Sequence, residues 1–469
     1  MSTSHESVFR LLSGEPLRKS LDSADPQAWV DFDLAVRSLP YVRRGALRAL
    51  TGLRAHARGA LSESQLAVAL CHPDGRVREA ALEWAPAVPA LLPLVVIRSA
   101  DWVAAVREEA RELLADLLPG VAHQAMAPFA ALVLRMARRQ HGDFAQALLK
   151  QSLVEGPPEA ITALLTGGDR AARRFGHRIA VERHLLAPLQ LARIAASDDD
   201  VVIQGLCAEA ALAAVREAAH GEVLEPLLGS RQPQVRAAGV TALRRTGCFA
   251  QAEPFLSDRA GIVRACARWV LRQNGTDPLP LYRALCADPT DEDLPPGAAL
   301  GLAECGTRAD AELLWPLVGH PVAAVRARAV AGLRVLDLTD AARLRPLVDD
   351  PAPAVAREVT GALIPDADKL APQWLETRLA PERPAHTRTA AFRLLCAQGG
   401  TVELRSALML LTDRNPRLRF RAEQAVRRWT PSPTTALGDR ELATLIDRHE
   451  PALGRQAALL LRRGLGIPS

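Results

Sequence analysis

A short motif recurs along almost the whole chain and constrains its fold more than any other feature. The motif consists of an apolar residue, an arginine, two variable residues, a small residue, two variable residues and another apolar residue. Clear copies begin at Val77, Val106, Val235, Val263 and Val325. In each copy the apolar and small residues are three or four positions apart, as on one face of an α-helix, and they do not alternate as in a strand. We therefore expect helices throughout and no strands.

The copies recur with a period of about 31 residues, which matches two helices of about 11 to 13 residues joined by two short turns. We call the arginine position of each copy, or the residue that replaces it, an anchor position. The anchor positions are Arg43, Arg78, Arg107, His141, Arg173, Gln204, Arg236, Arg264, Pro295, Arg326, Arg357, Arg388, Arg419 and Arg455. A single helix pair buries too little apolar surface to offset its conformational entropy, so neighbouring pairs must stack. The predicted fold is an all-α solenoid, a right-handed α-α superhelix of about 14 helix pairs.

Other residues agree with this period. A polar residue followed by proline precedes several anchored helices, as at His320-Pro321 and Asn415-Pro416, and this pair is typical of a helix start. Glycines such as Gly275, Gly306 and Gly399 stand where the anchored helix should end. The small residue of the motif should allow close helix contact at Ala81, Ala110, Gly239, Ala267, Ala329, Ala391, Ala422 and Ala458.

The motif resembles the HEAT repeats of the short bacterial class, a type also found in phycobilin lyase subunits. The resemblance covers about residues 40 to 466. It implies three parts: an N-terminal capping segment (1–38), a repeat array (39–435) and a C-terminal capping repeat (436–469). Trp29 and Phe32 of the first segment should cover the open face of the first repeat. In HEAT families the repeated arginine pairs with neighbouring polar groups, so the resemblance implies a structural role for the anchors.

The sequence contains none of the common catalytic or metal-binding motifs. None of the three lysines follows a glycine, as a phosphate-binding P-loop requires, and neither G-x-S-x-G nor H-E-x-x-H occurs. The seven cysteines are scattered singly without a CxxC pair, which suits buried thiols in a reducing cytoplasm. We therefore expect no catalytic residues, no metal and no cofactor. No segment has the length and apolarity of a membrane span, so we expect no membrane contact.

One enzymatic alternative deserves comparison with the tryptophans. HEAT-like DNA alkylpurine glycosylases hold a damaged base with tryptophans and an acidic residue. Asp101-Trp102 and the run from Trp29 to Asp31 are the nearest matches in this chain. Most of the seven tryptophans occupy apolar positions of the motif, which favours packing in the core.

Two helical segments carry a stripe of arginines on one face. Three residues of the first, Arg170, Arg174 and Arg178, lie opposite an apolar side, and a second stripe repeats this pattern. The second stripe comprises Arg417, Arg421 and Arg428. Each stripe is either a solvated helix face or a surface that binds an anionic partner. The net charge of +5 does not decide between them.

Two functional hypotheses follow. The first is a cytoplasmic, non-enzymatic scaffold or adaptor that holds a protein partner on a concave surface formed by the second, anchored helices of the repeats. The second is a HEAT-like nucleic-acid-binding protein, with a DNA alkylpurine glycosylase as its enzymatic extreme. A bilin lyase is a third alternative that rests on the fold resemblance alone.

Overall fold

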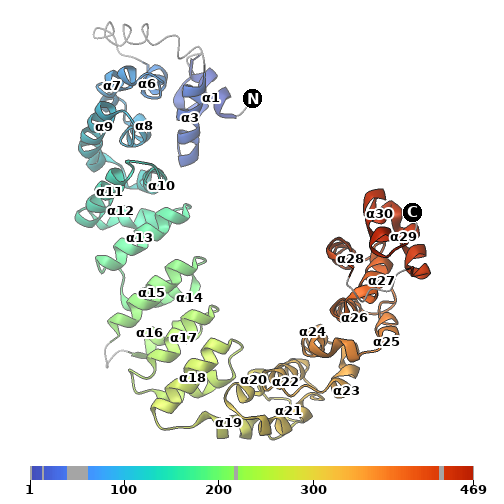
Figure 1. The fold of residues 1–469 in the computed structure, drawn as a ribbon. Coiled ribbons are helices and arrows are strands. Elements are labelled where there is room, and N and C mark those ends of the chain that lie inside the picture. The colour runs from blue at the N-terminus through green and yellow to red at the C-terminus, as the bar shows by residue number, and fades with distance from the viewer. Residues whose placement is uncertain (1–2, 13–14, 40–61, 216–219, 432–437, 468–469) are drawn as a thin grey trace. The chain divides into compact units, whose positions relative to one another are not determined.

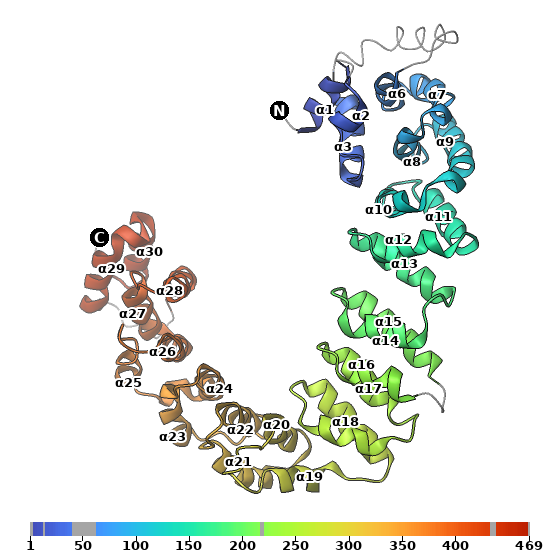
Figure 2. The same cartoon turned by 180° about the vertical axis from the view of Figure 1, so that it is seen from behind.

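The structure is a computed structural model that describes every residue except 1–2, 13–14, 40–61, 216–219, 432–437 and 468–469. Throughout this described part the chain forms helices and turns and contains no strand, which confirms the all-α class (Figures 1 and 2). The helices form two compact units, Met1–Gly239 and Val240–Ser469. The first anchor, Arg43, lies outside the described residues, and the division into capping segments and array stays a prediction.

Unit 1 is a series of antiparallel helix pairs preceded by three N-terminal helices. Its helices are α1 (Thr3–Leu12), α2 (Leu17–Ser20), α3 (Pro26–Ser38), α6 (Glu63–Leu70), α7 (Gly75–Leu82), α8 (Leu92–Arg98), α9 (Ala104–Leu117), α10 (Met126–Met136), α11 (Asp143–Glu155), α12 (Pro158–Leu165), α13 (Arg170–Glu182), α14 (Pro188–Ser197), α15 (Val201–Ala214) and α16 (His220–Leu228). The boundary between the units falls within α17 (Pro233–Ala242).

Unit 2 continues the same pattern. Its helices are α18 (Gly261–Gln273), α19 (Pro278–Leu285), α20 (Pro296–Cys305), α21 (Ala311–Leu317), α22 (Ala323–Val335), α23 (Ala341–Leu344), α24 (Pro353–Leu363), α25 (Pro372–Glu376), α26 (Ala385–Gln398), α27 (Gly400–Leu410), α28 (Pro416–Arg428), α29 (Arg440–Leu453) and α30 (Arg455–Gly464). Within this unit α20, α22, α24 and α26 pack side by side as the second helices of successive pairs (Figure 1).

Several first helices of unit 2 are short or have 3-10 geometry because they contain proline. Pro254 interrupts the 3-10 helix η6 (Phe249–Ser257), and Pro316 lies inside α21. Proline lacks the backbone N–H that an α-helix needs and clashes with the preceding turn. The anchored second helices have no proline beyond their first turn, and from α18 to α28 they are longer than the first helices that precede them.

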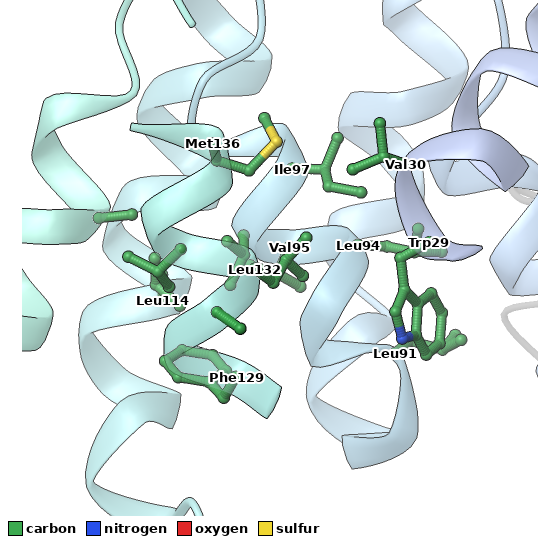
Figure 3. Close-up of a cluster of buried hydrophobic side chains, with 14 of the residues drawn as sticks. Trp29, Val30, Leu91, Leu94, Val95, Ile97, Leu114, Phe129, Leu132 and Met136 are labelled. Carbon is green, nitrogen blue, oxygen red and sulfur yellow. The ribbon is translucent and has the colours of Figure 1, made fainter. Parts of the chain in front are cut away.

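The N-terminal helix α3 contributes buried side chains to the core of unit 1. Trp29 is only 2% exposed and Phe32 is completely buried. Figure 3 shows Trp29 and Val30 of α3 beside Leu91 and Leu94, next to further apolar side chains of α8, α9 and α10. The indole N–H of Trp29 donates to the carbonyl of Ser23 at 3.1 Å, so its single polar group is satisfied.

The small residues of the motif are buried at helix contacts. Ala81, Ala110, Ala267 and Ala329 are completely buried. A Cβ atom built on the buried Gly239 would lie 3.1 Å from the Cβ of Leu227, which shows how closely the paired helices approach. The prediction that these positions accept only small side chains follows from this packing.

Most anchor positions fall on the fourth residue of a second helix, as Arg78 does in α7 and Arg326 in α22. Arg455 is instead the exposed first residue of α30, and Pro295 lies directly before α20. His141 has a φ of 65° and lies in the turn before α11, so it is not a helical anchor. In α24 the buried position belongs to Ala356, and Arg357 is exposed one residue later. Our placement of an anchor at Arg357 was therefore wrong by one residue.

Candidate functional site

The anchor arginines close the turn that precedes their own helix. In six of them one guanidinium nitrogen donates to the carbonyl oxygen six residues earlier, whereas Arg388 donates to the carbonyl of Leu379, nine residues earlier. The distance is 2.7 Å from Arg78 to His72, and 2.8 Å from Arg326 to His320. The same bond recurs at Arg107, Arg236, Arg264 and Arg419, and Gln204 makes it with its amide. Carbonyl groups in turns have no hydrogen-bond donor from a helix, and the arginine provides a donor to one of these carbonyls.

The remaining guanidinium nitrogens of several anchors bind a carboxylate of the next repeat. Arg78 donates to both oxygens of Asp101 at 3.0 and 2.8 Å, and Arg326 donates to both oxygens of Asp350 at 2.9 Å. Arg388 makes the same bidentate contact with Asp413. These anchors connect one repeat to the next, which confirms their structural role. Their charges are therefore not available to a ligand.

We call these anchor arginines and the carboxylates that they bind the ladder. The carboxylates also accept hydrogen bonds from backbone N–H groups at the start of the next helix. Asp101 accepts from the backbone N–H of Val103 at 3.0 Å, and Asp350 accepts from that of Ala352 at 2.8 Å. Before α20 the ladder has no such aspartate, and Glu304 of α20 binds Arg264 and Arg268 instead. This replacement explains why the motif is degenerate near Pro295.

Further ion pairs between arginines and aspartates of neighbouring helices predict that the stability of the protein falls in acid. Hydrogen bonds from Arg283 hold the pKa of Asp310 below its ordinary value. Burial raises the pKa of Asp200, but hydrogen bonds from Arg174 and Arg170 outweigh burial and the net shift is downward. The unfolded chain, with aspartate pKa values near about 3.9, therefore binds more protons than the folded chain in acid. The free energy of unfolding should be level near neutrality and fall as the pH drops through about 4.

Urea unfolding from neutral pH down to about pH 3 checks this prediction. Asp310→Asn should be less stable than the wild type at neutral pH, and the difference should shrink in acid as Asp310 of the wild type becomes protonated. A difference that is equally large at both ends of the pH range would contradict the assigned ion pair.

Two arginines of the first predicted stripe share one carboxylate inside unit 1. The Nε atoms of Arg170 and Arg174 lie 2.5 and 2.8 Å from Asp200 Oδ2, and Arg174 makes a second hydrogen bond to Oδ1. Only Arg178 of the three is exposed with no recorded acidic partner within the described residues. The stripe lines a cavity of about 510 Å³ together with Arg135 and Arg138 of α10.

The second predicted stripe lines a larger cavity of unit 2. All three residues, Arg417, Arg421 and Arg428, project from α28 into a groove of about 1010 Å³ that α24 and α26 also border. The structure adds Arg357 of α24 and Arg393 of α26, which our sequence analysis missed. We call this cavity with its five arginines the arginine groove.

The charges of the arginine groove are not compensated. Among the described residues no ion pair joins Arg393 or any of the three α28 arginines to a carboxylate. The exposed Arg357 approaches only its half-buried neighbour Glu358, at 3.5 Å. Glu403 is the one carboxyl group among the lining residues, and burial raises its pKa above the ordinary value. The groove is therefore a concentrated positive surface.

Large apolar side chains are exposed on several second helices of unit 2, namely α18, α22 and α28, and directly after α24. They are more than a third exposed although most large apolar residues of the unit are buried, and they comprise Ile262, Trp269, Val335, Ile364 and Phe420. Four of them occupy helical positions away from the buried stripe of their helix, and Ile364 begins the 3-10 helix η9 (Ile364–Lys369) that follows α24. We call them the apolar face. Trp269 also borders a cavity of about 280 Å³ with Ala265 and Cys266.

The apolar face could have been found from the sequence. A helical projection of each motif copy places these residues away from the anchor and the small position. We expected most tryptophans to pack in the core or between repeats. Trp29 and Trp429 are buried and Trp102 stacks on arginines of α3 and α7, whereas Trp269 is exposed. The guanidinium group of Arg244 lies over the Trp269 ring, 5.3 Å from its centre, and Trp269 is still 41% exposed.

The residues that resemble a glycosylase site are otherwise engaged. Asp101 is 2% exposed and forms ion pairs with Arg78 and Arg98. Trp102 is exposed but stacks on the guanidinium groups of Arg37 and Arg78, 4.2 and 4.5 Å from the ring centre. The Asp101 carboxylate therefore stabilises the fold of unit 1, and its position offers no base-binding pocket.

The thiols show no sign of activation. All seven cysteines are free, and Cys71, Cys207 and Cys286 are buried. Burial raises the pKa of Cys207 and of Cys286 to about 12. A thiol with a raised pKa is a poor nucleophile at neutral pH. No group of three or more metal-ligating side chains comes together in the described ranges, and none of the helices described is both long and apolar enough to cross a bilayer.

Comparisons with known proteins find similarity only among solved structures. No protein-family model and no curated protein sequence matches this chain. The crystal structure of Kap121p bound to Pho4p aligns with 97% of this chain and 55% of its own, at 13% identity and a TM-score of 0.34. Kap121p bound to RanGTP aligns with 88% and 51%, at 16% identity and a TM-score of 0.30. The chain thus spans about half the length of these structures.

Proposed function

We propose that this chain is a cytoplasmic, non-enzymatic scaffold that binds a protein partner along the second helices of unit 2. The observation that carries the proposal is the apolar face. Exposed apolar residues are normally scattered singly, whereas here they recur on the second helices α18, α22 and α28. Tryptophan and phenylalanine are the residue types that anchor protein interfaces, and Trp269 and Phe420 supply them here.

The apolar face favours a protein over a nucleic acid. Binding of duplex DNA depends mainly on arginines and lysines that follow the phosphate backbone. On α18 and α22 the outward positions hold Ile262, Trp269 and Val335, which offer no charge to a phosphate. A protein partner can cover apolar and charged positions in one interface, so it could contact both kinds of residue on the second helices.

Substitutions on the apolar face test the proposal. A partner should first be captured by crosslinking from cells that contain the native protein, and then purified. The variant Ile262→Ser, Trp269→Ser and Val335→Ser should bind it at least about tenfold more weakly, since aromatic anchors dominate interface energies. Calorimetry with the purified partner measures the change.

A matched control uses exposed apolar residues of the first helices. Leu285 of α19 and Met409 of α27 are 38% and 44% exposed, and their change to serine should leave the affinity unaltered. If both variants weaken binding equally, or if neither does, the partner does not use the second helices and the proposal fails.

A further inference from the structure

The arginine groove differs from the rest of the second-helix surface in its chemistry. The anchors of the same repeats, Arg326 and Arg388, are held by Asp350 and Asp413. The groove arginines lie on α24, α26 and α28, and among the described residues none of them is held in this way. Arg357 makes only a 3.5 Å contact with its neighbour Glu358. Five guanidinium groups in one cavity repel each other, so an occupant that supplies negative charge would be bound favourably.

The groove is also lined by apolar side chains, which an occupant would have to cover. Phe420 stands between Arg417 and Arg421 in the sequence of α28 and is 60% exposed. Phe392, Ala390 and Ala425 also line the cavity. An occupant that only carried charge would leave Phe420 in water, whereas one with an apolar side chain would cover it.

We propose that the arginine groove binds an acidic segment of the protein partner, with an apolar side chain seated on Phe420. The proposal rests on the scaffold function above and names the chemistry of the partner. Guanidinium groups bind carboxylates through two parallel hydrogen bonds, a geometry that favours arginine over lysine. The groove contains arginines and no lysine.

The spacing on α28 suits an extended segment. Arg417 and Arg421 are four residues apart, which is about 6 Å along a helix axis. Two residues of an extended chain span about 6.6 Å. A segment that runs beside α28 with carboxylates at alternate residues would therefore meet both arginines. The residues between these carboxylates would point away from the two arginines.

A nucleic acid fits the same surface less well. Phosphates would satisfy the arginines, and a base could stack on Phe420. However, the outward positions of α18 and α22 on the same face are apolar, so a continuous phosphate backbone would lose its charged contacts beyond α24. Binding of a nucleic acid is therefore an outcome that the test must be able to detect.

The test measures binding of defined probes to the full chain. The acidic probe is a labelled peptide of about twelve residues, roughly 40 Å when extended, that alternates glutamate and serine around a central leucine. A second peptide has glutamine in place of every glutamate. Two oligonucleotides, one single-stranded and one duplex of about 20 base pairs, serve as phosphate probes. Fluorescence anisotropy at about 150 mM salt reports each affinity.

The acidic peptide should bind, and its affinity should fall with added salt. Changing Arg417, Arg421 and Arg428 together to glutamine should weaken it by at least about tenfold. The control variant changes Arg272, Arg414 and Arg440, which are exposed outside the groove, and so removes the same net charge. This control should shift the affinity by less than about twofold. Circular dichroism should show that both variants keep the helical fold.

Four outcomes would overturn the acidic-segment proposal. Equal binding of the glutamine peptide would show that carboxylates are not recognised, and equal effects of the two triple variants would show attraction by net charge alone. An oligonucleotide that binds more tightly than the peptide and loses affinity only in the groove variant would make the groove a phosphate site. If the captured partner still binds the groove variant and not the apolar-face variant, the scaffold function stands and the acidic segment falls.

Discussion

Replacement of Asp101 by alanine is expected to destabilise unit 1 by about 3–5 kcal/mol, because it would leave buried positive charges without a partner. Asp101 accepts hydrogen bonds from both Arg78 and Arg98, and the three side chains are at most 1% exposed. Arg98 also contacts Asp33 of α3 at 2.5 Å, so the cluster connects the N-terminal helices to α8 and α9. Its loss should loosen the closure of the unit's core.

Urea unfolding gives the stability change, and hydrogen exchange of α3, α8 and α9 locates it. The control is Asp366→Ala, which removes an ion pair with Lys369 that is mostly exposed to water. This variant should show no measurable change, since exposed ion pairs add little to stability. If the two variants behave alike, the buried cluster does not hold these helices together.

Replacement of Ala329 by leucine is expected to cost about 1–3 kcal/mol because it overpacks a close helix contact. Ala329 is completely buried on α22, which packs between α20 and α24. One turn later, a Cβ built on Gly332 would lie 3.2 Å from the carbonyl oxygen of Ala299, so the helices have no room for a larger side chain.

The matched control lies one residue earlier. Arg328 is partly exposed on a different side of the helix, and its change to alanine should cost about 0.5 kcal/mol or less. Denaturant unfolding of both variants decides between the two positions. Equal losses of stability would mean that the motif has been aligned with the wrong face of α22.

The position of the repeats could be predicted because the signal is local. A helix buries residues three and four apart, so the small and apolar positions appear in the sequence without knowledge of what packs on them. Ala81, Ala267 and Ala329 were predicted in this way and are buried. The prediction failed where the motif is degenerate. At Val355-Ala356-Arg357 the arginine stands one residue after the buried position, and a rotation of about 100° moves it into the solvent.

The sequence by itself determined the helical class, the period and the two arginine stripes, since these depend on spacing within one helix. Only the tertiary structure decided which stripe keeps its charge. Arg170, Arg174 and Arg178 resemble Arg417, Arg421 and Arg428 in sequence, but Asp200 of the next repeat binds two of the first three. No acidic residue among the described ones reaches the second three, while Arg357 and Arg393 from other helices join them. Charge compensation depends on side chains about 30 residues away, and only stacking of the repeats brings them within hydrogen-bond distance.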